Sequence, residues 1–460
     1  MNITSTFFLF LFLPAAFLGQ VVFRNGMPKR VFLLLVSLFF YAWGDPRHLL
    51  LLVLMIAWNY GAAIAVAKLP EAGARNACLA LAVISNLAVL FLYKYLTFFS
   101  SILPEPLRLP ASTALALPLG ISFFVFKMIS FQIDAYRKKE LAGCGILDFA
   151  LYVSFFPQVL SGPIARFEPF WKQLPDGLPD RAACADGAER FMIGACKKLL
   201  LAEPAALAAN AAFSAGTLSM PLAWVGSVAY TLQIYYDFSG YSDMAIGLGK
   251  LFGLDTDENF RHPYNSLSIQ EFWRRWHISL SSWFRDYVYF PLGGSRCSLA
   301  RTCLNTAIVF ALTGLWHGAN WTFVAWGLYH AVFLILERAA LKPVLERTPG
   351  PVRLLYTMFV VNIGWILFRA DSLPAALRYI RALFGLPAGG GCQLVQLITL
   401  ESFAAIAAGL VMMFPLREAL REKLMEKAPF VYDTAVTAGF LMAICYSAGS
   451  GFHPFLYVQF

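Results

Sequence analysis

The chain has 460 residues, of which 59% are apolar and 14% are charged, against roughly 25% charged residues in ordinary soluble domains. This composition excludes a string of soluble domains and predicts an all-α polytopic membrane protein. The net charge of +9 comes from lysines and arginines dispersed between apolar segments, which is typical of cytoplasmic loops and not of a nucleic-acid surface. The cysteines show no zinc spacing, so we expect buried free thiols.

The first apolar segment, residues 4–23, is long enough to cross a bilayer at about 1.5 Å per residue. The basic residues follow it at 24–30 instead of preceding it, so we expect a retained span and not a cleaved signal peptide. This charge bias predicts an extracytoplasmic N-terminus. Further spans are expected near 31–44, 48–67, 77–99 and 114–134.

The apolar segment 145–160 has basic loops on both sides, which predicts a re-entrant or interfacial element covered by protein. Later spans are expected near 199–213, 222–252, 302–317, 321–337, 354–368, 396–415 and 431–449. The total is about eleven or twelve spans around a central tunnel, with the C-terminus extracytoplasmic. We divide this single membrane domain into N-terminal spans (1–140), a catalytic core (141–340) and C-terminal spans (341–460).

Within the core, Ser268 followed by Glu271 forms a capping box and predicts a helix start. We expect one interfacial helix over about 269–290 with an aromatic stripe along one side. The stripe comprises Trp273, Trp276, Leu280, Trp283 and Tyr287, with His277 at its edge and Arg274, Arg275 and Arg285 on the other side. Interfacial anchoring explains the tryptophans and positive-inside placement explains the arginines. The functional alternative for the arginines is contact with the phosphates of an anionic donor.

The segment Trp316–Trp321 lies inside an apolar stretch from about 302 to 336. Removing a polar group from water costs several kcal/mol unless it finds partners, so an intramembrane His317 favours a functional interpretation. Gly314 and Gly318 leave room for a backbone or a ligand to come close. The alternative is a structural histidine bonded to a carbonyl of a neighbouring helix. No two histidines have the i,i+4 spacing of a helical metal site, so we expect no metal.

These residues belong to a series of motifs that resembles the membrane-bound O-acyltransferase family, in particular its bacterial alginate O-acetyltransferase branch. The matching segments are 155–158, 161–164, 236–245, 258–260, 271–286, 291–294, 312–321, 327–330, 365–370 and 455–460. They cover most of the chain in the order found in the family. The resemblance implies a helical fold in which a cytoplasmic funnel meets an outer cavity at the intramembrane histidine.

The resemblance also implies roles for individual residues. His317 matches the catalytic position and His277 matches the second polar position of the family. Tyr457 is a candidate acyl relay, with interfacial anchoring as its alternative, and the neighbouring Val458 departs from the aromatic residue usual there. The implied donor is cytoplasmic acetyl-CoA, with no tightly bound cofactor. The implied partner is a separate extracytoplasmic SGNH-type acetyltransferase that places the acetyl group on a polysaccharide, outside the bacterial inner membrane.

A neutral histidine poised near pH 7 suits this chemistry, because a hydroxyl must lose its proton as it attacks a thioester. We therefore expect His317 to be the general base and His277 to orient donor or acceptor. Candidate donor contacts are Arg274, Arg275, Arg285, Trp316 and Asn320. Three alternatives remain: D-alanyl transfer from a carrier protein towards teichoic acids, a transporter or channel, and a scaffold that recruits the outer partner. Alginate, cellulose, another exopolysaccharide and peptidoglycan are all compatible acceptors.

Overall fold

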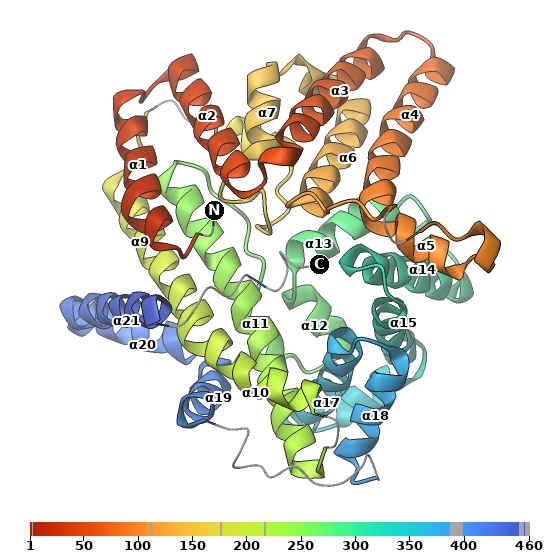
Figure 1. Cartoon of the computed structure of the whole chain (residues 1–460), viewed down its shortest axis with the longest axis vertical. Helices are drawn as coiled ribbons and strands as arrows, with labels where there is room; N and C mark the ends of the chain where they lie inside the picture. Colours follow the sequence, from red (N-terminus) through yellow and green to blue (C-terminus); the bar gives the residue numbers. More distant parts are fainter. Residues whose placement is uncertain are drawn as a thin grey trace. The chain divides into compact units, whose positions relative to one another are not determined.

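The computed structural model describes residues 1, 3–110, 113–174, 177–215, 218–386, 399–449 and 455. Every regular element in these residues is helical, which confirms the all-α prediction. The chain forms two compact units, one from Met1–Phe191 with Asp243–Asp257 and one from Met192–Ser242 with Glu258–Phe460. Helices α9 (Arg181–Cys196) and α11 (Met220–Leu251), both labelled in Figure 1, contribute residues to both units.

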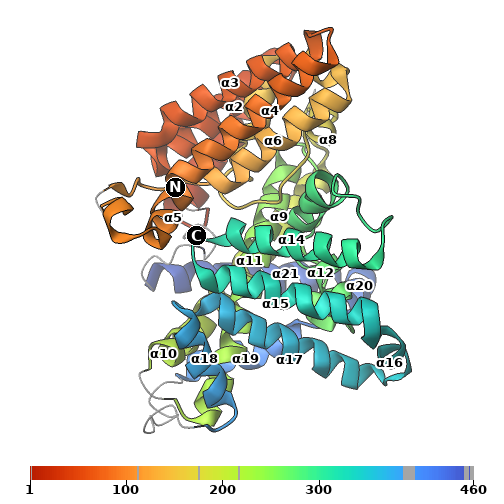
Figure 2. The ribbon, with the colours of Figure 1, turned by 90° about the vertical axis from the view of Figure 1, so that its right-hand side faces the viewer.

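The first unit is a helical bundle in which α3 packs against α4 and α6, and α2 packs against α7. Figures 1 and 2 show α3, α4 and α6 running side by side. Its helices are α1 (Leu13–Val22), α2 (Gly26–Gly44), α3 (Leu49–Lys68), α4 (Ala72–Leu90), α5 (Leu96–Ile102), α6 (Ile121–Arg137), α7 (Ile146–Ser154) and α8 (Phe167–Lys172).

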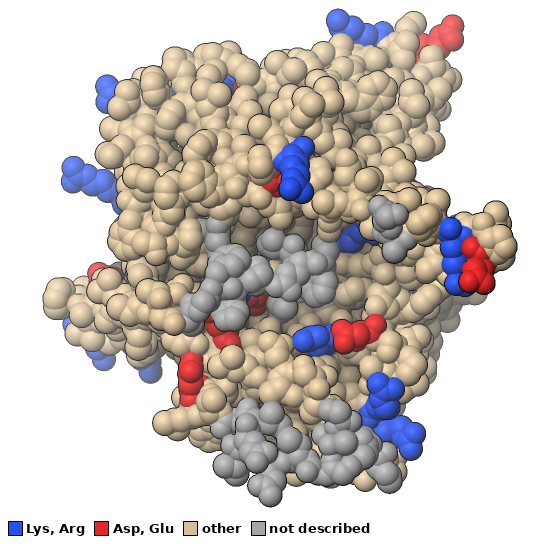
Figure 3. Space-filling model, viewed as in Figure 1, with Lys and Arg blue, Asp and Glu red and all other residues tan. Residues whose placement is uncertain are grey.

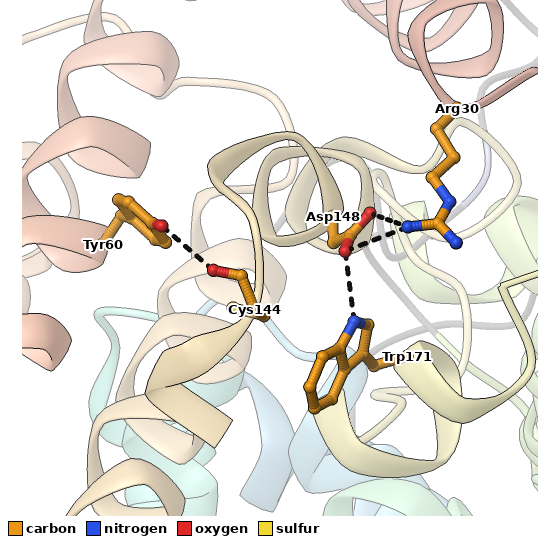
Figure 4. Close-up of polar contacts among 5 residues, drawn as sticks. All are labelled: Arg30, Tyr60, Cys144, Asp148 and Trp171. Carbon is orange, nitrogen blue, oxygen red and sulfur yellow. Dashed lines mark hydrogen bonds and ion pairs between the residues drawn. The ribbon is translucent and has the colours of Figure 1, made fainter. Parts of the chain in front are cut away.

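Helix α7 corresponds to the predicted re-entrant or interfacial element. Its 9 residues are too few to cross a bilayer, which needs about 20. A buried carboxylate holds it in place: Asp148 accepts hydrogen bonds from Arg30 at 3.0 Å and from Trp171 Nε1 at 3.1 Å (Figure 4). The Tyr60 hydroxyl donates to the Cys144 carbonyl just before the helix at 2.9 Å. These contacts tie α7 to α2, α3 and α8.

The second unit contains three long helices, α14, α15 and α17, that lie side by side (Figure 2). Two glycines permit the close packing of α14 on α15. A Cβ on Gly314 would lie 2.3 Å from the Phe323 carbonyl oxygen, and one on Gly327 would lie 2.1 Å from that of Phe310. The predicted close approach at Gly314 is therefore confirmed. The helices are α10 (Glu203–Ser214), α12 (Ile269–Arg275), α13 (Ile278–Phe284), α14 (Leu299–His317), α15 (Trp321–Leu336), α16 (Lys342–Arg347), α17 (Gly350–Arg369), α18 (Leu373–Leu383), α19 (Leu400–Met412), α20 (Leu416–Lys427) and α21 (Pro429–Gly449).

The exposed surface of both units is strongly apolar. Among the described residues, 7 helices are long and apolar enough to cross a membrane, and two shorter apolar helices occupy Phe8–Val22 and Leu400–Met412. The remaining predicted spans coincide with α6, α10 and α11. Figure 3 shows few charged side chains among uncharged ones on the face in view. The chain is therefore a multi-pass membrane protein.

The prediction of a single interfacial helix over about 269–290 is wrong. The helix does begin after Ser268, whose hydroxyl accepts the Glu271 amide, but α12 ends at Arg275 and α13 starts at Ile278. Between them His277 adopts a left-handed backbone with φ 44° and ψ 55°, and a π-helical turn follows α13. The helical period that joined the aromatic stripe does not continue across this break.

The break arises from contacts that are distant in sequence. Asn259 accepts the Ile278 amide on its carbonyl at 3.0 Å and the Ser279 amide on its side-chain oxygen at 3.1 Å. These bonds replace those that a continuous helix would make. As a result the stripe tryptophans are buried in protein, with Trp276 only 1% exposed. Interfacial anchoring therefore does not explain them.

Candidate active site

His317 is the last residue of α14 and lies at the tip of the α14–α15 hairpin. The helix stops there because Gly318 is extended, and Asn320 caps the next helix by accepting the Thr322 amide at 3.1 Å. The imidazole is only 3% exposed. Its ring centroid lies 5.0 Å from the Trp326 ring and 5.1 Å from the Phe368 ring. The hairpin thus places His317 inside a wall of aromatic rings.

His277 is held by the strained turn between α12 and α13. Its Nδ1 lies 3.2 Å from Asn259 Oδ1, which also accepts from the Ser279 backbone and hydroxyl. Because this oxygen acts as an acceptor, Nδ1 carries the proton and Nε2 keeps the lone pair. Burial lowers the pKa of His277 to about 3, so the ring is neutral near pH 7. A left-handed conformation at a non-glycine residue costs roughly 1–2 kcal/mol and often marks a functional site.

Trp316 connects the two histidines. Its ring lies 5.0 Å from that of His317 and 5.9 Å from that of His277, and it is 4% exposed. The His277 ring also packs edge-on against Phe238, with the ring centroids 4.6 Å apart. The structure therefore brings both predicted catalytic histidines to one buried indole, although they are forty positions apart in the sequence.

A pocket of about 540 Å³ lies on one side of His317; we call it the Lys198 pocket. Phe323 and Phe368 form part of its wall, and Phe368 contacts the His317 ring. Lys198 also lines the pocket, with Nζ 2.5 Å from Asp237 and 3.5 Å from Glu203. These three side chains are all buried, so each charge depends on its partners. The pocket is thus polar and is separated from His317 by one phenyl ring.

A second pocket, of about 230 Å³, contains the predicted arginines Arg274 and Arg285 together with Arg338; we call it the Arg274 pocket. Trp273 also lines it. The Trp273 ring lies 5.6 Å from Trp326, which in turn contacts His317. Two indoles therefore separate this pocket from the imidazole.

The structure divides the predicted donor-binding residues among several places. Arg274 and Arg285 share the Arg274 pocket. Arg275 instead forms an ion pair with Glu271 at 2.5 Å. Asn320 lines the Lys198 pocket, so it does not join the arginines, and Trp316 lies between the histidines. Tyr457 and most of the terminal motif lie outside the described residues.

Sequence reasoning missed four groups at this site. Asn259 belongs to a matching motif, but only the structure reveals that it holds the His277 turn. Lys198 and Asp237 carried a usable signal, because charged residues within apolar segments favour a functional interpretation. Arg338 lines the Arg274 pocket, and no motif in the sequence points to it.

Comparison with known proteins agrees with this architecture. Residues 129–368 match the model of the membrane-bound O-acyltransferase family. The chain is 39% identical over 447 residues to a probable alginate O-acetylase, AlgI, of Pseudomonas aeruginosa, covering 93% of this chain and 84% of the relative. It is 36% identical over 423 residues to a peptidoglycan O-acetyltransferase of Helicobacter pylori, covering 84% and 80%. It is 31% identical over 275 residues to a teichoic acid D-alanyltransferase of Bacillus subtilis, covering 55% and 66%. The chain therefore belongs to the membrane-bound O-acyltransferase family.

Proposed function

We propose that this membrane-bound O-acyltransferase moves an acetyl group from cytoplasmic acetyl-CoA across the inner membrane for the O-acetylation of an extracytoplasmic polysaccharide. The acetylating relatives support the acetyl group, because they align over 84% to 93% of the chain. The D-alanylating relative aligns over only 55%. By the same argument the acceptor is an alginate-like exopolysaccharide or peptidoglycan, reached through an SGNH-type partner protein.

The observation that carries the proposal is the position of His317. It is a buried imidazole that contacts Phe368 in the wall of the Lys198 pocket. It also contacts Trp326, which in turn contacts Trp273 in the wall of the Arg274 pocket. In the proposed reaction the acceptor hydroxyl attacks the thioester carbonyl carbon while His317 removes its proton. The tetrahedral intermediate then collapses, the carbon–sulfur bond breaks, and the thiolate leaves and takes up the proton. The products are an acetyl ester and free coenzyme A.

His277 acts as a positioning residue in this proposal. With the proton on Nδ1 fixed by Asn259, its Nε2 accepts a hydrogen bond and orients a hydroxyl beside Trp316. The constrained turn keeps the ring in one orientation, as a preorganised site requires.

Each pocket suits one substrate. The Arg274 pocket is basic and faces the cytoplasm under the positive-inside rule, which suits an anionic thioester donor. The Lys198 pocket suits a hydroxylated acceptor on the opposite side. There, Gln233 Oε1 and Thr322 Oγ1 are buried and have no hydrogen-bond partner among the described residues, so both are available to an acceptor. By the positive-inside rule we also propose that both chain termini lie outside the cytoplasm.

Acetyl transfer by the purified, reconstituted protein tests the proposal. With labelled acetyl-CoA and a soluble acceptor, His317→Gln should reduce transfer by a factor of at least about 10², the lower range for general-base catalysis. His48→Ala is the matched control. Its ring bonds to the nearby Asp45 carboxylate, so the substitution should leave acetyl transfer intact. Full transfer by His317→Gln would reject the base assignment. Movement of the substrate without any acyl chemistry would instead indicate a transporter.

A further inference from the structure

The start of α12 is held by a carboxylate from a different helical segment. Glu337 is the first residue after α15 and is only 5% exposed. Its Oε1 accepts the backbone amide of Ile269 at 2.7 Å, and its Oε2 accepts that of Gln270 at 2.9 Å. These amides are two of the first-turn donors for which a helix has no partner of its own. A side chain distant in the sequence therefore completes the N-terminus of α12.

The local capping box serves other donors of the same turn. The Ser268 hydroxyl accepts the Glu271 amide at 3.0 Å, and the Glu271 carboxylate accepts the Leu267 amide at 2.8 Å. A further tertiary contact comes from α17, where Arg353 donates from Nε to the Leu267 carbonyl at 3.2 Å. The capping box and the carboxylate after α15 thus bond to different amides, so the one does not substitute for the other.

The position of α12 along α15 depends on such tertiary contacts. The helix has only 7 residues, and a helix of that length is not stable by itself. It packs against α15 (Figure 1), where the Trp273 ring lies 5.6 Å from that of Trp326 and 5.0 Å from that of His330. Burial of apolar surface is non-directional, whereas a hydrogen bond weakens steeply when its geometry changes. The two directional bonds from Glu337 thus fix where α12 begins on α15.

Each of these two helices leads to one histidine of the site. Helix α12 ends two residues before His277, and α15 begins four residues after His317. Helix α15 also carries Trp326, whose ring lies 5.0 Å from that of His317. A shift of α12 along α15 would therefore move the His277 ring relative to His317 and to Trp316, which contacts both histidines.

We infer that Glu337 is a positioning residue for acyl transfer, which sets the location of the His277 ring by fixing the start of α12 on α15. The inference rests on the proposed function. In this role Glu337 touches neither substrate and acts only through α12 and His277. Its substitution should therefore lower kcat and leave the KM for acetyl-CoA close to the wild-type value.

A double-mutant cycle with the purified, reconstituted protein tests this role. Glu337→Gln keeps the length of the side chain but replaces one acceptor oxygen with an NH2 donor. Since a misplacement of 1 Å can reduce the rate about 10²-fold, this smaller change should lower kcat about tenfold. In a His277→Ala background the same substitution should have little further effect, because the ring that Glu337 positions is absent. Equal fold losses in the two backgrounds would overturn the inference.

Glu346→Gln is the matched control. It removes the same charge nine residues later in the chain, but Glu346 lies on exposed α16 and pairs with Lys342 at 3.9 Å. Its kcat and its KM for acetyl-CoA should equal the wild-type values. If both glutamate variants lost the same activity, or if Glu337→Gln raised the KM and left kcat unchanged, the lost charge would be responsible and the inference would be overturned.

Hydrogen exchange gives a second readout, which requires no turnover in any variant. In Glu337→Gln, exchange should become faster at the two amides that bond to this carboxylate. It should also become faster at the amides of Ile278 and Ser279, which bond to Asn259 beyond the His277 turn. Unchanged exchange in α14 would exclude general unfolding. Faster exchange confined to the first turn of α12, or no change at all, would overturn the inference.

The two proposals fail in different ways. Faster exchange at the His277 turn, without any transfer from acetyl-CoA by the wild-type protein, would support the link from Glu337 to His277 and reject the proposed function. Transfer by the wild-type protein with an unchanged kcat in Glu337→Gln would support the function and reject the positioning role.

Discussion

The left-handed turn at His277 predicts an unusual order of stability for two substitutions. His277→Gly and His277→Ala both remove the imidazole and its bond to Asn259, so they differ by one methyl group and by backbone preference. At φ 44° alanine pays roughly 1–2 kcal/mol that glycine does not. Glycine in turn loses about 0.4–1 kcal/mol more through the entropy of its unfolded chain. The glycine variant should therefore be more stable by about 1 kcal/mol.

Thermal unfolding of the detergent-solubilised variants measures this order. Ser282, in the regular helix α13, provides the matched control, because there alanine should be more stable than glycine by about 1 kcal/mol. Glycine should therefore be the more stable variant at position 277, and alanine the more stable variant at position 282. If His277→Ala were as stable as His277→Gly or more so, the left-handed turn and the break between α12 and α13 would be refuted.

Asn259→Ala should destabilise the protein by about 3 kcal/mol, because it leaves several buried donors without an acceptor, and it should also reduce acetyl transfer. The control is Asn305→Ala, at another buried asparagine. It should lower the stability but reduce transfer only in proportion to the loss of folded protein. An unchanged melting temperature in Asn259→Ala would contradict its role. Asp148→Ala should lower the stability by about 2 kcal/mol, because Arg30 loses its hydrogen-bond acceptor. Equal stability of this variant and the wild-type protein in calorimetry would contradict the role of Asp148. The pKa of His277 is about 3 when folded and about 6.5 when unfolded, so the unfolded chain binds the proton first and stability falls as the pH drops below about 6.5. At pH 5 the free energy of unfolding should therefore be lower by about 2 kcal/mol. Melting curves of His277→Gly, measured across the same pH range, should not show this decrease.

Much of the fold follows from composition and hydropathy, because a membrane helix must be long, apolar and internally hydrogen-bonded. Every predicted span therefore overlaps a helix, although α6 begins only at Ile121 and residues 396–398 of the span 396–415 lie outside the described residues. The prediction of one continuous helix over 269–290 was wrong for a specific reason. Its local pattern is that of one amphipathic helix, and only the bonds from Asn259, ten or more positions earlier, reveal the break at His277. Local periodicity contains no information about such a partner.

The candidate site likewise contains residues that the sequence can point to and residues that only the structure brings together. His317 could be predicted as a candidate because an ionisable residue in an apolar segment is costly. The structure places its ring among aromatic side chains, and its catalytic role stays a prediction. Arg275 and Arg285 looked equivalent on a helical wheel, yet Arg275 pairs with Glu271 whereas Arg285 lines a pocket. Arg338 and Arg353 come from other helices and join Arg274 only through tertiary packing. Sequence patterns cannot assemble residues from separate helices.

Acetyl transfer across a sealed membrane tests the central claim most directly. Proteoliposomes are loaded with labelled acetyl-CoA, the acceptor hydroxyl is supplied only outside, and label on the outer acceptor is measured. The account predicts labelled acceptor with the wild-type protein in the orientation that exposes the Arg274 pocket to the lumen, and none with His317→Gln. Label on the outer acceptor that is independent of His317 would contradict it.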